Sequence, residues 1–315
     1  MGQPPAIVVS GLSKHFGEER AVDALSFEVH PGEIFGLVGP DGAGKTTTLR
    51  MLAGVLAVDS GDARVAGYDV VQNPEGAKHH LSYMSQRFGL YEDLTVDENL
   101  RFYADLFGVR RKQRELRSRE LLAAAGLSEF RERLAGNLSG GMKQKLGLVC
   151  SLIHTPQVIL LDEPTNGVDP VSRRDFWRIL YSLVSEGVAI LTSTSYLDEA
   201  ERCHRVGLIY QGHMLYCDTP ARLKEKFPGE ILAAFSTQPG RVREVLARAP
   251  GVSSALLVGD RVHLFVDRVA LRLADLQARL EAAQVPYDSI QAVPPTMEDL
   301  FVSAVAGEQA EAKAP

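Results

Sequence analysis

The sequence has few cysteines and no excess of basic residues. Its 315 residues include three scattered cysteines, Cys150, Cys203 and Cys217. This odd, dispersed set indicates reduced thiols in a cytosol and counts against a disulfide framework or a cysteine metal site. The formal net charge of −6 gives no general basic field, so we expect no nucleic-acid partner.

Long hydrophobic runs are also missing. No apolar stretch approaches the ~18 residues that a membrane-spanning helix needs. The first residues, MGQPPAIVV, lack the basic segment and long apolar core of a secretory signal, and Ala6 stands where a myristoylation motif has Ser or Thr. We therefore expect no membrane anchor of its own. The hydrophobic content of 45% and charged content of 23% are ordinary for a globular protein, and the length permits two domains.

A glycine-rich loop is the first feature that predicts chemistry. Residues 39–47 read GPDGAGKTT and fit the phosphate-binding pattern G-x-x-x-x-G-K-[ST]. They follow the apolar run Ile34–Val38, a predicted strand, and precede a helix predicted over Thr46–Leu56. The glycines let backbone N–H groups turn around phosphate oxygens, and the helix N-terminus adds partial positive charge. Lys45 can reach the β- and γ-phosphates, and the Thr46 hydroxyl can bind Mg²⁺. The predicted nucleotide-binding residues of this loop are Gly39, Asp41, Gly42, Ala43, Gly44, Lys45, Thr46 and Thr47.

A second segment supplies the acidic groups that such a site needs. Residues 158–164 read VILLDEP, and the four apolar residues predict a strand buried on both faces of a parallel sheet. Asp162 then lies at the carboxyl end of the strand, where open α/β sheets bind ligands, and it can hold Mg²⁺ through water. Glu163 follows directly and can accept a proton from an attacking water. A chance glycine-rich turn and a solvated acidic turn are the simpler alternatives; the two motifs in one chain count against both.

A third segment, between these two, resembles a known family. Residues 138–145 read LSGGMKQK, which is similar to the signature of ATP-binding-cassette (ABC) ATPases. Ser139, Gly140 and Gly141 begin a predicted helix, so their N–H groups and the Ser139 hydroxyl can bind a γ-phosphate. The resemblance implies that this phosphate belongs to ATP held by a second protomer, in a head-to-tail dimer that sandwiches two ATPs. An isolated SGG would fit an ordinary helix cap; its position between two phosphate motifs makes it specific.

Further positions match the family over roughly residues 5–225. The resemblance implies that Phe16 stacks on adenine with Val22 beside it. It implies that Gln86 senses Mg²⁺ and the attacking water, and links the ATP site to the surface that meets a membrane partner. The alternatives are a core aromatic for Phe16, because aromatic side chains are often buried, and a polar loop residue for Gln86.

One position departs from the family. After the predicted strand Val188–Thr192 the family usually has a histidine that contacts the γ-phosphate, but residues 192–203 read TSTSYLDEAERC and place Ser195 there. Loss of one preorganised donor typically costs about 10²–10³ in rate. His204 lies too far along the chain to replace it, and Asp41 stands where the family more often has Asn. Ser195 is thus either a tolerated variant or the mark of a slow site that pairs with a competent ATPase.

The order of patterns predicts an α/β fold for residues 1–227. Residues 7–35 alternate polar and apolar, which is typical of antiparallel strands. Residues 88–145 are rich in helix formers and predict a helical subdomain that carries the signature. Strands and helices alternate over 158–216, so a parallel sheet flanked by helices is expected there. Taken with the resemblance, this order implies a P-loop ABC ATPase core.

A second, smaller domain is predicted over 230–305. Its β-α-β-β-α-β order suggests an α+β, ferredoxin-like unit, and a C-terminal helix should begin with Thr296 as cap and Asp299 three residues on. Residues 306–315 are small and polar, so we expect a disordered tail. No catalytic constellation is evident in this domain.

The function implied by the resemblance is an ATP-hydrolysing subunit of a bacterial ABC exporter of the drug-resistance class. The sequence most resembles the first ATPase half of tandem multidrug exporter ATPases. ATP and Mg²⁺ would be its ligands, and membrane-spanning permease subunits and a second ABC ATPase protomer its partners. The expected location is cytoplasmic and peripheral, on the inner face of the cell membrane. A non-hydrolysing regulatory subunit and a soluble ABC ATPase without a transport role are the alternatives.

Overall fold

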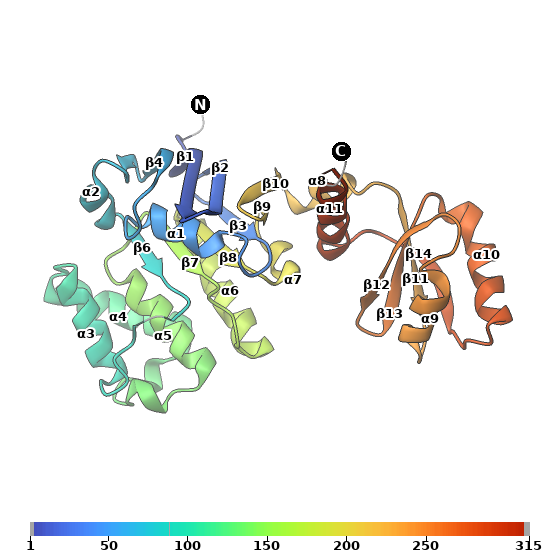
Figure 1. Ribbon diagram of the computed structural model, residues 1–315. Helices are drawn as coiled ribbons and strands as arrows, with labels where there is room; N and C mark the ends of the chain where they lie inside the picture. The colour runs from blue at the N-terminus through green and yellow to red at the C-terminus, as the bar shows by residue number, and fades with distance from the viewer. Residues whose placement is uncertain (1–2, 88, 312–315) are drawn as a thin grey trace. The chain divides into compact units, whose positions relative to one another are not determined.

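The chain divides into two compact units, Met1–Thr219 and Pro220–Pro315. The computed structural model describes residues 3–87 and 89–311 (Figure 1). The division falls before residue 227, where the sequence predicts the end of the first domain. Helix α8 (Pro220–Glu225) belongs with the second unit because it packs against α11 (Met297–Glu311).

A six-stranded sheet forms the centre of the first unit, in the order β10-β9-β3-β8-β7-β6. Its strands are β3 (Ile34–Val38), β6 (Leu81–Met84), β7 (Val158–Asp162), β8 (Ala189–Thr194), β9 (Arg205–Tyr210) and β10 (His213–Asp218). All neighbouring pairs are parallel except β9 and β10. Strands β3, β7 and β8 are buried throughout, as expected for parallel strands covered on both faces.

The register of the sheet places three chain segments side by side. Val38 pairs with Thr194, and Asp162 pairs with Ser193. The residues that follow β3, β7 and β8 therefore leave the sheet at one edge, where open α/β sheets bind ligands.

An antiparallel sheet with the order β2-β1-β4-β5 packs against the same core. It consists of β1 (Ile7–Phe16), β2 (Glu19–Val29), β4 (Ser60–Val65) and β5 (Tyr68–Asp69). In the second half of β2 buried and exposed residues alternate, so that one face meets the core and the other faces solvent.

Seven α-helices surround these sheets in the described part of the first unit. They are α1 (Lys45–Leu52), α2 (Pro74–Lys78), α3 (Val96–Leu106), α4 (Arg111–Ala125), α5 (Gly140–Leu152), α6 (Pro170–Ser185) and α7 (Leu197–Ala200). Helices α3, α4 and α5 contact one another and form a group beside the sheet (Figure 1). Helix α1 ends at Leu52, earlier than the predicted Leu56, because Gly54 has a φ of 66° and leaves the helical conformation.

The second unit contains a four-stranded antiparallel sheet with the order β12-β13-β11-β14. Its elements are β11 (Glu230–Phe235), α9 (Pro239–Leu246), β12 (Val252–Val258), β13 (Arg261–Val266), α10 (Val269–Ala282) and β14 (Ser289–Val293). This is the predicted β-α-β-β-α-β order. Its hydrophobic core, which includes Leu232, Leu264 and Leu276, lies between the sheet and helices α9 and α10.

Helix α11 corrects one prediction and confirms another. It runs to Glu311, so residues 306–311 are helical where the sequence predicts disorder; residues 312–315 lie outside the described part. Good helix formers in EQAE continue the helix. The predicted start is correct: the Asp299 N–H donates to Thr296 Oγ1 at 3.2 Å, and the Thr296 N–H donates to Asp299 Oδ2 at 2.9 Å. Asp299 also pairs with His263 Nδ1 at 2.9 Å, and both side chains are buried.

Candidate functional site

A cavity of about 610 Å³ opens at the edge of the central sheet where β3, β7 and β8 end. Segments far apart in the sequence line it: the end of β1, the loop before α1, and the residues after β6, β7 and β8. Its lining residues are Phe16, Glu19, Ala21, Asp41, Gly42, Gly44, Lys45, Thr46, Thr47, Gln86, Glu163, Asn166, Ser195 and Tyr196. The structure thus brings most of the predicted site residues together.

Two glycines of the loop are required by close backbone approaches. A Cβ on Gly39 would lie 2.1 Å from the Ile209 carbonyl oxygen, and a Cβ on Gly44 would lie 2.3 Å from that of Ala21. Gly44 also has a φ of 99°, which an L side chain rarely adopts. Without side chains at these positions the loop can wrap tightly, with its N–H groups available to phosphate oxygens.

Lys45 is buried at the base of the cavity, and its ammonium group contacts three oxygen atoms of the protein. Nζ donates to the carbonyl oxygens of Gly39 at 2.8 Å and Pro40 at 2.9 Å. It also forms an ion pair of 3.1 Å with Glu163 Oε1. A phosphate bound in this loop would compete with these partners for the Lys45 ammonium.

Asp162 and Thr46 place two oxygen atoms side by side. Thr46 Oγ1 donates to Asp162 Oδ1 at 2.8 Å, and Ser193 Oγ donates to the same oxygen at 2.8 Å. The Tyr83 hydroxyl donates to Asp162 Oδ2 at 3.3 Å; burial and the Asp162 charge raise the Tyr83 pKa. One carboxylate and one hydroxyl suit Mg²⁺, which prefers oxygen ligands and keeps several waters. The oxygens of Thr46 and Asp162 therefore fit Mg²⁺, whereas Gln86 lines the same cavity and stays a predicted ligand.

Glu163 turns into the cavity with an unusual backbone. Its φ is 47°, a value that is strained for a non-glycine residue and is often found at active sites. The Glu163 N–H donates to the carbonyl oxygen of Ser193 at 3.2 Å and to its Oγ at 3.0 Å. Strand β8 thus holds the carboxylate next to Lys45.

A buried carboxylate links the loops that follow β7 and β8. Glu199, on α7, is 1% exposed. It accepts hydrogen bonds from Thr165 Oγ1 at 2.5 Å, Thr194 Oγ1 at 2.9 Å and Trp177 Nε1 at 3.4 Å. Thr165 lies two residues after Glu163, and Thr194 directly precedes Ser195. The two loops are thereby anchored to one internal group.

The remaining predicted residues differ in their positions. Phe16 is 52% exposed and lines the cavity, which excludes the alternative of a core aromatic. Val22 is fully buried and does not line the cavity, so the geometry gives no support to its predicted contact with adenine. Ser195 and the exposed Gln86 both line the cavity. His204 binds the Ile34 N–H through Nδ1 at 3.0 Å, at the opposite end of β3, and it cannot replace the missing histidine.

The residues of the signature segment lie apart from this cavity. Ser139 caps α5 by accepting the Met142 N–H at 3.3 Å, and both Ser139 and Gly140 are exposed. A Cβ on Gly141 would lie 2.3 Å from Ser172 Oγ, so glycine is required there. None of the three lines the cavity. Their predicted binding to ATP on a second protomer remains a prediction.

Sequence reasoning missed Asn166 and Tyr196, which also line the cavity. Asn166 Nδ2 lies 3.4 Å from Glu163 Oε2, and the Tyr196 hydroxyl donates to Asn166 Oδ1 at 3.2 Å. Their only sequence signal was their position next to predicted site residues, since the contact joins two loops that lie 30 residues apart in the chain.

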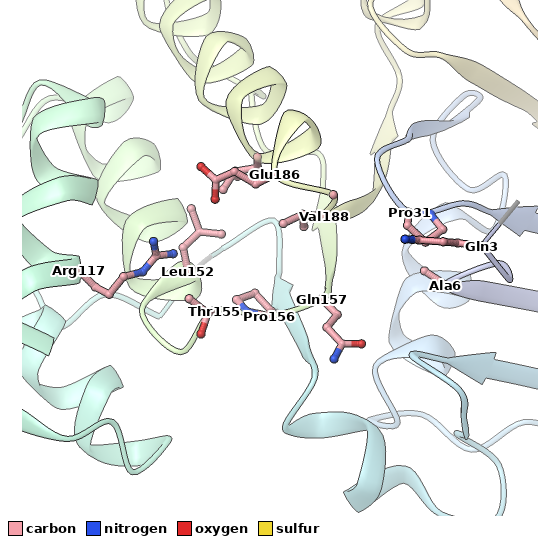
Figure 2. A pocket seen from close by; sticks show the side chains of 12 residues that line it. Gln3, Ala6, Pro31, Arg117, Leu152, Thr155, Pro156, Gln157, Glu186 and Val188 are labelled. Carbon is pink, nitrogen blue, oxygen red and sulfur yellow. The ribbon is translucent and has the colours of Figure 1, made fainter. Parts of the chain in front are cut away.

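A second cavity, of about 410 Å³, lies at the opposite ends of β7 and β8. Pro156 and Gln157 precede β7, and Val188 precedes β8; Figure 2 shows all three between Arg117 and Pro31. None of the predicted site residues lines this cavity.

The loop, the two carboxylates at the end of β7 and the sheet edge define a P-loop nucleotide-binding protein. Residues 22–166 match the family model described as ABC transporter. The chain is 46% identical over 311 residues to the "Probable multidrug ABC transporter ATP-binding protein YbhF" of Escherichia coli (strain K12); the match covers 96% of this chain and 52% of that protein. The chain therefore spans about half the length of this relative.

Other relatives match over nearly their whole length. The "Daunorubicin resistance ATP-binding protein DrrA2" of Streptomyces coeruleorubidus is 35% identical over 302 residues, which cover 94% of each chain. A solved structure titled "Structure of ATP binding subunit of ABC transporter" has a TM-score of 0.65 and 29% identity, and the match covers 70% of this chain and 93% of that one. The chain belongs to the ABC transporter ATP-binding protein family.

Proposed function

We propose that this chain is the ATP-binding and ATP-hydrolysing subunit of a bacterial ABC exporter of the drug-resistance class. One observation carries the proposal: a single cavity is lined by the glycine loop, Lys45, Thr46 and Glu163, and Thr46 is hydrogen-bonded to Asp162 behind it. The drug-resistance assignment is supported by the names of relatives that are 35% to 46% identical. Within residues 3–87 and 89–311, no helix is long and apolar enough to span a bilayer. We infer a peripheral position on the cytoplasmic face of the membrane.

The roles of the site residues follow from their positions. The loop N–H groups and Lys45 bind the phosphates of ATP, and Phe16 stacks on its base. Thr46 and Asp162 hold Mg²⁺, which spreads the charge of the β- and γ-phosphates. Glu163 takes the proton of the attacking water. Gln86, an exposed residue that lines the cavity, would contact both that water and the metal.

The site is completed by a second ABC ATPase protomer. Ser139, Gly140 and Gly141 form an exposed helix start that does not reach this chain's own cavity. A helix N-terminus with free N–H groups favours a phosphate. We infer that this segment binds the γ-phosphate on the partner, so that ATP closes the dimer and hydrolysis opens it.

A groove beside β6 suits the membrane-spanning permease subunits. It has a volume of about 440 Å³ and lies between β6 and α3. Val55 and Leu106, which line it, are 62% and 65% exposed. Exposed apolar side chains that gather in a groove are typical of protein interaction sites. The Tyr103 hydroxyl, also in the groove, donates to the Gly89 carbonyl at 2.7 Å and so ties the loop after Gln86 to α3. A permease segment in this groove would contact Tyr103, which is hydrogen-bonded to the loop that follows Gln86.

The groove assignment is tested with a pair of matched variants. Leu106→Glu should abolish copurification with the permease subunits, because it puts a charge into an apolar contact. Leu116→Glu changes a similarly exposed leucine on α4, outside the groove, and should have no effect. Equal retention of both variants on membranes would contradict this assignment.

Hydrolysis is tested with Glu163→Gln in the purified full-length chain. The amide is isosteric and removes charge next to phosphate, so ATP binding should persist. Turnover should fall by about 10²–10⁴, the contribution of a general base. Glu186→Gln, an exposed glutamate at the far end of the sheet, is the control. Unchanged turnover in Glu163→Gln would contradict the role of Glu163 as the base.

A further inference from the structure

The Glu163 carboxylate has a different partner on each of its two oxygens. Oε1 faces Lys45 Nζ at 3.1 Å, and Oε2 faces Asn166 Nδ2 at 3.4 Å. Under the proposed function, on which this inference rests, Lys45 also serves the phosphates. The Lys45 contact is therefore weakened when ATP binds, whereas the Asn166 contact does not compete with phosphate.

The Asn166 amide is oriented by Tyr196. The Tyr196 hydroxyl lies 3.2 Å from Asn166 Oδ1 and can donate to it. The carboxylate of Glu163 only accepts, so the amide must direct its NH₂ group to Glu163 and its oxygen to the tyrosine. The order of donors is thus fixed: Tyr196 to Asn166, and Asn166 to Glu163.

Tyr196 is itself held in place by the surrounding loops. The Arg173 guanidinium lies over its ring, 4.6 Å from the centroid, an attractive cation–π geometry. The Tyr196 N–H donates to Thr194 Oγ1 at 3.0 Å, and Thr194 is anchored to the buried Glu199. A preorganised support of this kind is what keeps a catalytic group in a productive position.

We propose that Tyr196 and Asn166 are positioning residues that hold Glu163 for proton transfer. They work beside Ser195, whose short side chain cannot reach as far as the usual histidine. The 3.4 Å contact is long for a hydrogen bond, as is common at catalytic sites before substrate binds, and it shortens in the complex with ATP. Asn166 is exposed in the single chain, and a second protomer would cover it.

The test compares hydrolysis parameters in the full-length chain. Tyr196→Phe keeps the ring against Arg173 and removes only the hydroxyl, so kcat should fall about threefold to tenfold, the effect of one hydrogen bond. The KM for ATP should change by less than about twofold, since no binding contact is removed. Tyr181→Phe is the control: its hydroxyl donates to the Arg202 carbonyl at 2.9 Å, on the outer side of α6. It should leave both parameters unchanged.

A second variant tests the order of the chain of hydrogen bonds. Asn166→Asp is isosteric but replaces the donor by a second carboxylate, so kcat should fall further than in Tyr196→Phe. Because the two residues act in series, the double variant should be no slower than Asn166→Asp alone.

The outcomes separate this inference from the proposed function. If Glu163→Gln is inactive while Tyr196→Phe and Asn166→Asp keep the wild-type kcat, the positioning role is refuted and the ATPase assignment stands. A higher KM with unchanged kcat would assign both residues to ATP binding and also refute the role. If the wild-type chain is no faster than Glu163→Gln, the proposed hydrolytic function itself fails.

Discussion

Replacement of Ser195 by histidine should accelerate hydrolysis if the native site is slow. Ser195 directly follows Thr194, the last residue of β8, whose side chain is fixed by Glu199. An imidazole at 195 would extend from this anchored position into a cavity of about 610 Å³ that also holds Glu163, so room is available. One added preorganised donor is worth about 10²–10³ at best, and we expect at least tenfold, or about 1.4 kcal/mol of barrier.

The assay is steady-state ATP hydrolysis by the assembled transporter, with ATP affinity measured separately. The affinity should change little, because the gain arises in the transition state. Ser185→His, on the C-terminal residue of α6 and outside the cavity, controls for the added imidazole. Brisk hydrolysis by the wild-type chain with no gain in Ser195→His would show that serine suffices and would refute the idea of a slow site.

Two further predictions concern the loop and the second unit. Gly44→Ala should abolish ATP binding in a fluorescent-nucleotide titration, because the added Cβ would lie 2.3 Å from the Ala21 carbonyl oxygen. The helical circular dichroism should be unchanged. Retained ATP affinity would contradict the close-approach argument. Asp299→Ala removes the side-chain acceptor of the cap residue Thr296 and a buried partner of His263, so urea unfolding at pH 7 should show a loss of about 2–4 kcal/mol in the free energy of unfolding. Burial opposes ionisation of Asp299, but hydrogen bonds from His263 and Thr296 outweigh it and hold the Asp299 pKa below its ordinary value. The stabilisation by Asp299 is then complete above its unfolded-state pKa of about 3.9 and is lost as pH falls through its lower folded-state pKa. The free energies of unfolding of wild type and variant should therefore converge in strong acid.

The fold followed from local signals because they were strong and repeated. The apolar run at 158–161 predicts strand β7 and the carboxylate at its end, and the glycine loop at 39–47 predicts the start of helix α1. The element order of the C-terminal domain was predicted equally well, since short strands rich in apolar residues flank two amphipathic helices. The predicted tail was wrong over residues 306–311 because small, polar composition suggested disorder, whereas extending the helix that precedes these residues requires no new nucleation.

The candidate site was less completely predictable. Residues of the contiguous motifs were found, whereas Asn166 and Tyr196 were missed because their hydrogen bond depends on how two loops meet. Val22 was placed next to the base by resemblance; it is fully buried on β2 and does not line the cavity, and its contact with adenine stays a prediction. Neither outcome could be read from residue type, because each depends on tertiary contacts of distant segments.

The sole tryptophan of the sequence gives this protein a built-in optical reporter. Trp177 is 2% exposed, and its indole N–H lies 3.4 Å from Glu199, the carboxylate that anchors Thr165 and Thr194. Indole emission responds to nearby charge and polarity, so a rearrangement of either loop should change its wavelength or intensity. Stopped-flow fluorescence of the unlabelled chain could then time loop movement separately from phosphate release.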